Sequence, residues 1–338
     1  MHFIFYMDSL TQIVLGAAVG EVVMGKKVGN KAMLYGAIAG TIPDLDVLAS
    51  HVTDTVTALE IHRGFTHSIV FCVLFAPALG WLVSKYETHK HVKDWAWLFF
   101  WAFLTHPLLD AHTTWGTQLF WPLDLRLAYK NIFVIDPLYT LPFLGCLLIA
   151  MWYKRTSKKR RFYTYLGLIL SSSYLFITVI LKGLAYLQFE KALTDQNITY
   201  IKMDTRPSPL NTILWNANVE TKDHYLLGSY SFFDTAPMSF TAYPKNTALL
   251  GDLILHEKVK RMIAISEGWY TISENNGQLY FNDLRFGLMS LEPSSQDFVF
   301  RFLIETHPNG VVTFTEQPRN RENARQLMAA LWSRIKGN

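Results

Sequence analysis

Residues 133–189 read FVIDPLYTLPFLGCLLIAMWYKRTSKKRRFYTYLGLILSSSYLFITVILKGLAYLQF. Two apolar runs, residues 133–153 and 165–189, flank the basic segment KRTSKKRR. Each run exceeds the roughly 18 to 20 residues that a membrane-spanning helix needs. A buried bundle in a soluble protein would also contain apolar helices, but it offers no reason for so basic a segment between them. The stretch therefore predicts two membrane spans with a basic connection.

Working outward from this stretch, four more apolar segments lie closer to the N-terminus: residues 10–25, 32–48, 68–84 and 95–109. The first two are rich in glycine and alanine, as expected where helices pack closely in a membrane. Half of the 338 residues are hydrophobic and only 17% are charged, which excludes a disordered chain. We predict a polytopic α-helical membrane bundle of about six spans.

Basic residues lie in every second connection between these segments, which the positive-inside rule assigns to the cytoplasm. They are Lys26, Lys27, Lys31, Lys85, Lys90, Lys93, Lys154, Arg155, Lys158, Lys159, Arg160 and Arg161. The N-terminus and everything after residue 190 are then extracytoplasmic. The net charge of +4 is too small to indicate a nucleic-acid partner. Cys72 and Cys146 lie inside apolar runs, so we expect buried thiols rather than a disulfide or a thiolate metal site.

After residue 190 the sequence changes to short segments that are rich in aromatic and β-branched residues, which is typical of strands. These segments are residues 212–218, 225–233, 269–273, 278–281 and 297–304. Asn275-Asn276-Gly277 predicts a tight hairpin. Residues 246–264 look helical, and residues 316–335 end in an amphipathic helix. We therefore predict two domains, a membrane domain over residues 1–190 and a soluble, extracytoplasmic α+β domain over residues 191–338.

Ionisable residues beside membrane spans are costly and usually functional. Here they form three groups: Ile42-Pro43-Asp44-Leu45-Asp46, the segment HRGFTHS at residues 62–68, and HPLLDAHTTWGT at residues 106–117. The predicted topology brings all three to the outer side of the membrane. His106 and Asp110, four residues apart, point from one face of a helix.

The three groups together predict a metal site with mixed imidazole and carboxylate ligands. The candidate ligands are Asp44, Asp46, His62, His67, His106 and Asp110. Such ligands suit Zn²⁺ above all, with Mn²⁺ or Fe²⁺ as alternatives. Four of them suffice for one ion and six could hold two. Ser68 is a candidate N-cap of the following helix.

These motifs, together with Met7-Asp8-Ser9-Leu10-Thr11-Gln12 and Phe120-Trp121-Pro122, resemble the bacterial inner-membrane metal-dependent hydrolases, also described as LexA-binding inner-membrane hydrolase-like proteins. The resemblance covers residues 7–190. It implies an inner-membrane location and a distant similarity to zinc-dependent phospholipase C and P1-type nucleases, and hence a phosphoesterase activity by analogy. Some members have a histidine at the position of Gln12, and Asp8, Gln12 and His112 are additional candidate ligands.

In such a site the metal would activate a bound water, and Asp46 or Asp110 could act as a general base. Arg63 is either an interfacial anchor or a phosphate-binding group. Arg126 and Lys130, in the outer loop, could also hold negative charge. A site at headgroup level suits a phospholipid or a lipid-linked phosphate. Glu21 and Lys182 also lie within apolar runs, and we expect structural pairing or snorkelling for both.

Two other functions use the same residues. A metal-binding membrane protein without catalysis, whose outer domain binds a partner, would have the same ligands as the hydrolase. A transporter would place polar groups at the bilayer midplane on repeated, broken helices. No repeat is visible in the sequence, and the polar groups here cluster at one end of the spans. The hydrolase is therefore the leading hypothesis and the metal-binding protein its alternative, while the oligomeric state is left open.

Overall fold

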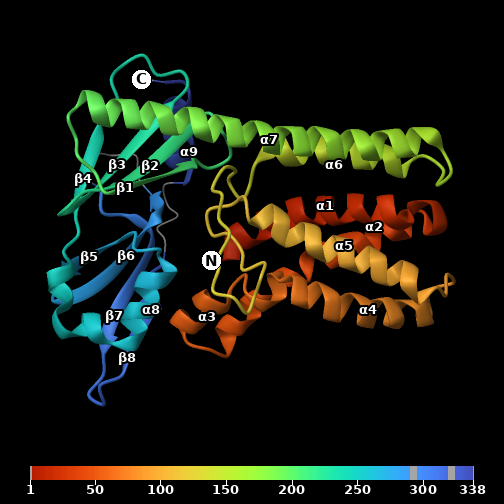
Figure 1. The fold of residues 1–338 in the computed structure, drawn as a ribbon, viewed down its shortest axis with the longest axis horizontal. Coiled ribbons are helices and arrows are strands. Elements are labelled where there is room, and N and C mark those ends of the chain that lie inside the picture. Colours follow the sequence, from red (N-terminus) through yellow and green to blue (C-terminus); the bar gives the residue numbers. More distant parts are fainter. Residues whose placement is uncertain (1, 290–294, 319–323, 338) are drawn as a thin grey trace. The chain divides into compact units, whose positions relative to one another are not determined.

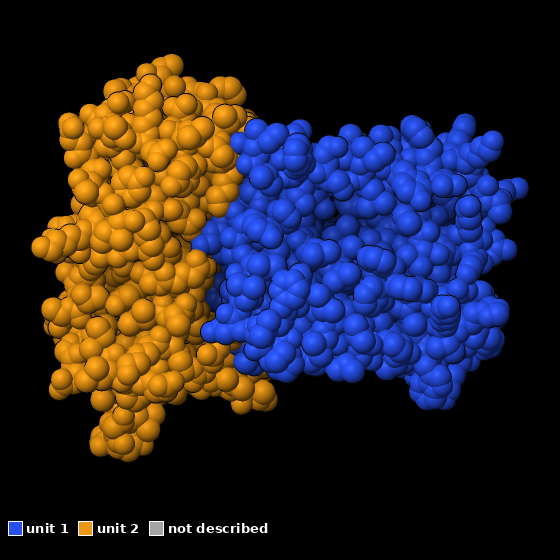
Figure 2. Space-filling view, viewed as in Figure 1, with its two compact units in different colours: residues 1–47, 61–180, 209–211 blue, residues 48–60, 181–208, 212–338 orange. Residues whose placement is uncertain are grey.

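The computed structural model describes residues 2–289, 295–318 and 324–337, with side chains described from residue 10 in the first helix and from residue 325 in the last. Helices make up the first part of the chain and antiparallel strands most of the second (Figure 1). The chain forms two compact units, which Figure 2 colours separately. Unit 1 comprises residues 1–47, 61–180 and 209–211, and unit 2 comprises residues 48–60, 181–208 and 212–338.

Each of the six apolar segments contains an α-helix, although the helix in residues 32–48 ends at Thr41. These helices are α1 (His2–Val28), α2 (Asn30–Thr41), α4 (Ile69–Tyr86), α5 (Val92–Asp110), α6 (Pro137–Met151) and α7 (Lys158–Asp195). Between α2 and α4 the chain forms two 3₁₀ helices, η1 (Pro43–His51) and η2 (Phe65–His67), and the short helix α3 (Thr55–Ile61). Ser68 caps α4, because its hydroxyl accepts a hydrogen bond from Phe71 N at 3.1 Å.

Two of the described helices, α4 and α7, are long and apolar enough to cross a membrane, and α2 with η1 could form a third, bent span. Six separate spans therefore remain a prediction. Helix α6 is one helix that is too short to be counted as a membrane span, since its 15 residues extend only about 22 Å at 1.5 Å per residue. The apolar run begins at residue 133, but Asp136 and Pro137 provide the N-cap and first position and so start the helix later.

Helices α1 and α2 approach so closely that only glycine fits between them. A Cβ atom on Gly36 would lie 2.1 Å from the carbonyl oxygen of Gly16, and one on Gly20 would lie 2.1 Å from that of Ala32. A Cβ atom on Gly40 would lie 2.4 Å from the carbonyl oxygen of Gln12. This is the close packing of small residues that the sequence predicts.

A buried ion pair joins α1 to α7 in unit 1. Arg160 donates to both carboxylate oxygens of Glu21, at 2.6 and 2.5 Å, and both side chains are buried. A third nitrogen–oxygen contact joins Arg160 to Asn30 Oδ1 at 2.7 Å. The prediction of a structural, paired role for Glu21 is confirmed.

The core of unit 1 is made of apolar side chains from α1, α2, α4, α5 and α6, and it includes the fully buried Trp95, Phe103 and Phe143. Cys72 and Cys146 are free thiols within these helices, and both are buried. The expectation of buried, unpaired cysteines is therefore confirmed.

Unit 2 contains two four-stranded antiparallel sheets, with strand orders β1-β2-β3-β4 and β5-β6-β7-β8 (Figure 1). The strands are β1 (Lys202–Pro207), β2 (Leu214–Glu220), β3 (His224–Ser231), β4 (Phe240–Pro244), β5 (Tyr270–Asn275), β6 (Gln278–Leu288), β7 (Phe298–Thr306) and β8 (Val312–Glu316). Asn276 and Gly277 connect β5 to β6 with φ angles of 53° and 75°, which confirms the predicted hairpin.

One of the two helical segments predicted in unit 2 is divided, and the other ends in a helix as predicted. Residues 246–264 form not one helix but the 3₁₀ segment η3 (Thr247–Leu255), kinked at Gly251, followed by α8 (Glu257–Ile265). At the C-terminus, α9 (Ala324–Ile335) follows strand β8. Helix α7 continues without a break through residue 190, where the sequence changes character.

Candidate metal centre

Four side chains in unit 1 point one ligand atom each at a common centre. They are Asp44 from η1, His67 from η2, and His106 and Asp110 from the last turns of α5. His67 Nε2 lies 3.1 Å from His106 Nε2, 3.3 Å from Asp44 Oδ1 and 3.2 Å from Asp110 Oδ2. His106 Nε2 lies 3.3 Å from Asp44 Oδ1 and also 3.3 Å from Asp110 Oδ2.

Five of the six spacings among these atoms are those of a tetrahedral metal site, and all four atoms lie within 4.8 Å of one another. In a regular tetrahedron with edges near 3.2 Å the centre lies about 2.0 Å from each corner, which is the usual Zn–N and Zn–O distance. Asp110 Oδ2 is buried and accepts no hydrogen bond from the described residues, although it faces both imidazoles. Its ion pair with Arg63, whose Nε lies 3.3 Å away, is not a hydrogen bond, and buried acceptors without a hydrogen bond are rare. The four residues therefore fit a divalent metal ion, and the donor set does not identify which one.

Neighbouring groups hold the four side chains in place. His106 Nδ1 donates to the carbonyl oxygen of Gly40 at 2.7 Å, which directs the lone pair of Nε2 towards the centre. Gln12 Nε2 donates to Asp110 Oδ1 at 2.8 Å, so that Oδ2 faces the imidazoles. Because Gly40 and Gln12 belong to the close α1–α2 contact, the packing of these helices sets the orientation of two candidate ligands.

Asp46 and His62 lie beside the four-residue group rather than in it. Asp46 Oδ1 is 3.0 Å from His62 Nδ1, and Oδ2 accepts from the backbone N–H of Arg63 at 2.7 Å. Residues two apart in a 3₁₀ helix diverge by about 120°, so Asp44 and Asp46 of η1 face different neighbours. Asp46 Oδ2 also lies 3.5 Å from His67 Nδ1 and can help to orient that ring.

Arg63 is a buried part of this site, with 4% of its surface exposed, so it is not an interfacial anchor. Its Nε lies 3.3 Å from Asp110 Oδ2, and another guanidinium nitrogen donates to Thr113 Oγ1 at 2.9 Å. Its φ of 57° is in the left-handed region, which costs energy for a residue other than glycine. Such strain at a buried cation is typical of functional sites.

The remaining candidates lie outside the four-residue group. Arg126 donates to the carbonyl oxygen of His62 at 3.2 Å, and Lys130 is buried. His112 Nδ1 lies 2.8 Å from Asn131 Oδ1, and burial lowers the pKa of its imidazole. The side chain of Asp8 lies outside the described residues.

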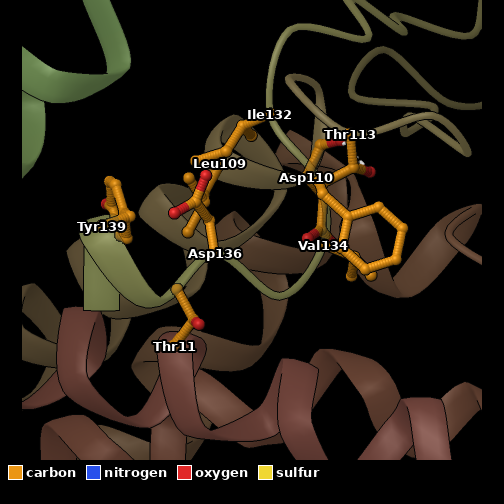
Figure 3. A pocket seen from close by; sticks show the side chains of 9 residues that line it. Thr11, Leu109, Asp110, Thr113, Ile132, Val134, Asp136 and Tyr139 are labelled. Carbon is orange, nitrogen blue, oxygen red and sulfur yellow. Dashed lines mark hydrogen bonds between the residues drawn. The ribbon is translucent and has the colours of Figure 1, made fainter. Parts of the chain in front are cut away.

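A small pocket lies next to Asp110 (Figure 3). Thr11 of α1, Thr113 of the loop after α5, and Asp136 and Tyr139 at the start of α6 help to line it. Asp136 is an ionisable residue within an apolar run, and it is not among the residues predicted from the sequence. The same criterion that identified the three polar groups could have found it.

A family model described as "YdjM inner membrane protein" matches residues 7–185, more than half of the chain. "Inner membrane protein YbcI" of Escherichia coli (strain K12) is 31% identical over 99 residues. These cover 29% of this chain and 57% of that protein, so the match spans little more than half of the relative's length. No solved structure matches the chain. Residues 7–185, which the family model matches, contain all four residues of the candidate centre.

Proposed function

The chain belongs to the YdjM family of inner membrane proteins, and on that premise we propose that it is a membrane-embedded metal-dependent hydrolase. Its substrates are phosphate esters on a phospholipid or a lipid-linked phosphate. Its membrane domain crosses the bilayer about six times, with the N-terminus, the metal centre and the C-terminal domain on the extracytoplasmic side. One zinc ion occupies the centre, with manganese or iron as alternatives.

One observation supports this proposal: His67 Nε2 and His106 Nε2 lie 3.1–3.3 Å from each other and from the facing oxygens of Asp44 and Asp110, and all four atoms lie within 4.8 Å of one another. The alternative, a metal-binding protein without catalysis, would use the same ligands. Two carboxylates already balance the charge of a divalent ion, so a site that only holds a metal needs no further cation. The buried guanidinium of Arg63 beside Asp110 therefore favours the hydrolase.

When bound, a metal held by these four residues would take a water as a further ligand, lower the pKa of that water and polarise a phosphoryl oxygen. The Asp46–His62 pair provides the proton acceptor. Asp46 Oδ1 accepts from His62 Nδ1, so the lone pair of the imidazole is at Nε2, the arrangement of a base held by a carboxylate. Asp110 serves as a ligand rather than a base in this scheme, because its Oδ2 lies 3.2 and 3.3 Å from the Nε2 atoms of His67 and His106.

The positive side chains around the centre bind the substrate. Arg63 is fixed by Thr113 and Asp110, and its planar guanidinium suits two phosphate oxygens at once. Arg126 is held near His62 by its bond to the carbonyl oxygen of that residue, and it adds positive charge at the same edge of the site. Lys130 follows in the same loop and contributes a third cationic group.

Phosphate release from vesicles by the detergent-purified, reconstituted protein tests the proposal. We expect release that stops when a chelator removes the metal and returns when zinc is added. Asp46→Asn should retain stoichiometric metal but lower kcat by about 10²–10⁴, the usual contribution of a general base and its partner. If the metal-loaded wild-type protein releases no phosphate from any lipid phosphate, the non-catalytic alternative is correct.

A further inference from the structure

Residues 120–125, FWPLDL, form a run in which every residue is exposed. We name it the aromatic loop. Its most exposed apolar side chains are Leu123, at 64%, and Leu125, at 49%, and Asp124 is its only charged residue. Consecutive exposed apolar residues of this kind are unfavourable in water and mark a surface that contacts something else.

The aromatic loop is attached to the segment that carries the site residues. The preceding residue, Leu119, accepts a hydrogen bond from Ile69 N at 3.0 Å, and Gln118 N donates to the carbonyl oxygen of Arg63 at 2.9 Å. The rings of Trp121 and Phe65 lie 5.0 Å apart in an edge-on contact. The loop is therefore joined by hydrogen bonds and a ring contact to the turn that presents Arg63 and His67.

The hydrogen bond between Ile69 and Leu119 also indicates how deep the aromatic loop lies in the membrane. Ile69 is the first residue of α4, one of the two described helices that are long and apolar enough to cross a membrane. A residue bonded to the first turn of a spanning helix lies where the hydrocarbon ends and the headgroups begin. Trp and Tyr are enriched at that level, and Trp121 and Tyr129 lie in and just after the loop.

We propose that the aromatic loop inserts into the headgroup region of the membrane and delivers an amphipathic substrate from the lipid phase to the metal centre. The insertion follows from the exposure and the attachment to α4, whereas the delivery of substrate rests on the proposed function. A lipid surface accounts for the loop better than a protein partner, because the loop is joined to the end of a membrane span and its exposed residues are those that favour the interface.

Site-specific fluorescence tests the insertion independently of any activity. An environment-sensitive fluorophore is attached to Leu123→Cys in the full-length protein, where the native cysteines are both buried. In vesicles we expect a blue shift and quenching by brominated lipids. The matched control is Glu274→Cys, an exposed position on strand β5, which should show neither. If the label at position 123 is not quenched by lipid, the insertion is wrong.

Charged substitutions test the delivery of substrate. The double variant Leu123→Asp/Leu125→Asp should lower hydrolysis of a vesicle-embedded lipid phosphate by about tenfold or more, since burial of two leucines is lost. Its metal content and its hydrolysis of a water-soluble phosphate ester should be unchanged. Equal loss on both substrates, or no loss on either, contradicts delivery by the loop. Absence of all hydrolysis in the wild-type protein contradicts the proposed function and leaves the fluorescence result to decide insertion.

Discussion

We expect His67→Ala to abolish stoichiometric binding of a divalent metal, whereas His62→Ala retains it. His67 Nε2 is 3.1–3.3 Å from the other three ligand atoms, so its loss leaves only three donors and opens the centre. His62 instead bonds Asp46 through Nδ1 and contributes no atom to the group. The two histidines lie only five residues apart, and each substitution removes one imidazole, which makes them a matched pair.

Metal content after gel filtration and thermal unfolding measures this difference. A ligand at one hundred times its Kd stabilises a folded protein by about 2.7 kcal/mol, so added zinc should raise the Tm of the wild-type protein and of His62→Ala. The Tm of His67→Ala should not respond. Equal metal loss in both variants would mean that His62 is a ligand and that the centre is larger than four residues.

The largest expected effect on stability comes from Gly36→Leu. A Cβ atom on Gly36 would lie 2.1 Å from the carbonyl oxygen of Gly16 and 3.0 Å from the Cα of Gly20, so backbone rather than a flexible side chain has to move. Separating α1 from α2 should cost about 3 kcal/mol or more, at the upper end of overpacking effects. It should also weaken metal binding, because the carbonyl of Gly40 on α2 orients His106.

Gly145→Leu is the matched control for this variant. Gly145 also lies within an apolar helix, α6, but a Cβ atom placed on it meets nothing within 4 Å. We expect its effect on the free energy of unfolding to stay within about 1 kcal/mol, as for substitutions that create no clash. If both variants unfold at the same temperature in detergent, the close α1–α2 contact is not what stabilises this part of the chain.

Local periodicity explains which parts of the site could be predicted from the sequence. His106 and Asp110 meet because residues four apart share a face of an α-helix, and Ser68 caps α4 as its position before an apolar run indicates. The distinction between Asp44 and Asp46 could not be predicted, because it depends on the 3₁₀ geometry of η1. Neither could the role of Gly40, whose carbonyl contacts His106 only through tertiary packing.

In the fold, too, the elements set by local sequence could be predicted, whereas those set by tertiary contacts could not. The basic segment and the apolar runs predict the helices of unit 1. Asn276-Gly277 predicts the hairpin between β5 and β6 in unit 2. Strand β1, with the polar sequence KMDTRP, was missed because it is a strand through its pairing with β2 rather than through its composition. Helix α6 is shorter than its apolar run because a capping carboxylate and a proline begin it late.

X-ray absorption at the zinc edge of the purified, zinc-loaded protein tests the central claim most directly. The claim is that Asp44, His67, His106 and Asp110 together hold one ion. The spectrum should show one zinc per chain with the four nitrogen and oxygen ligands of these residues, and at most one further water oxygen, at about 2.0 Å, with outer scattering from two imidazoles. Sulfur neighbours near about 2.3 Å, fewer than two imidazoles, or no tightly bound zinc would contradict it.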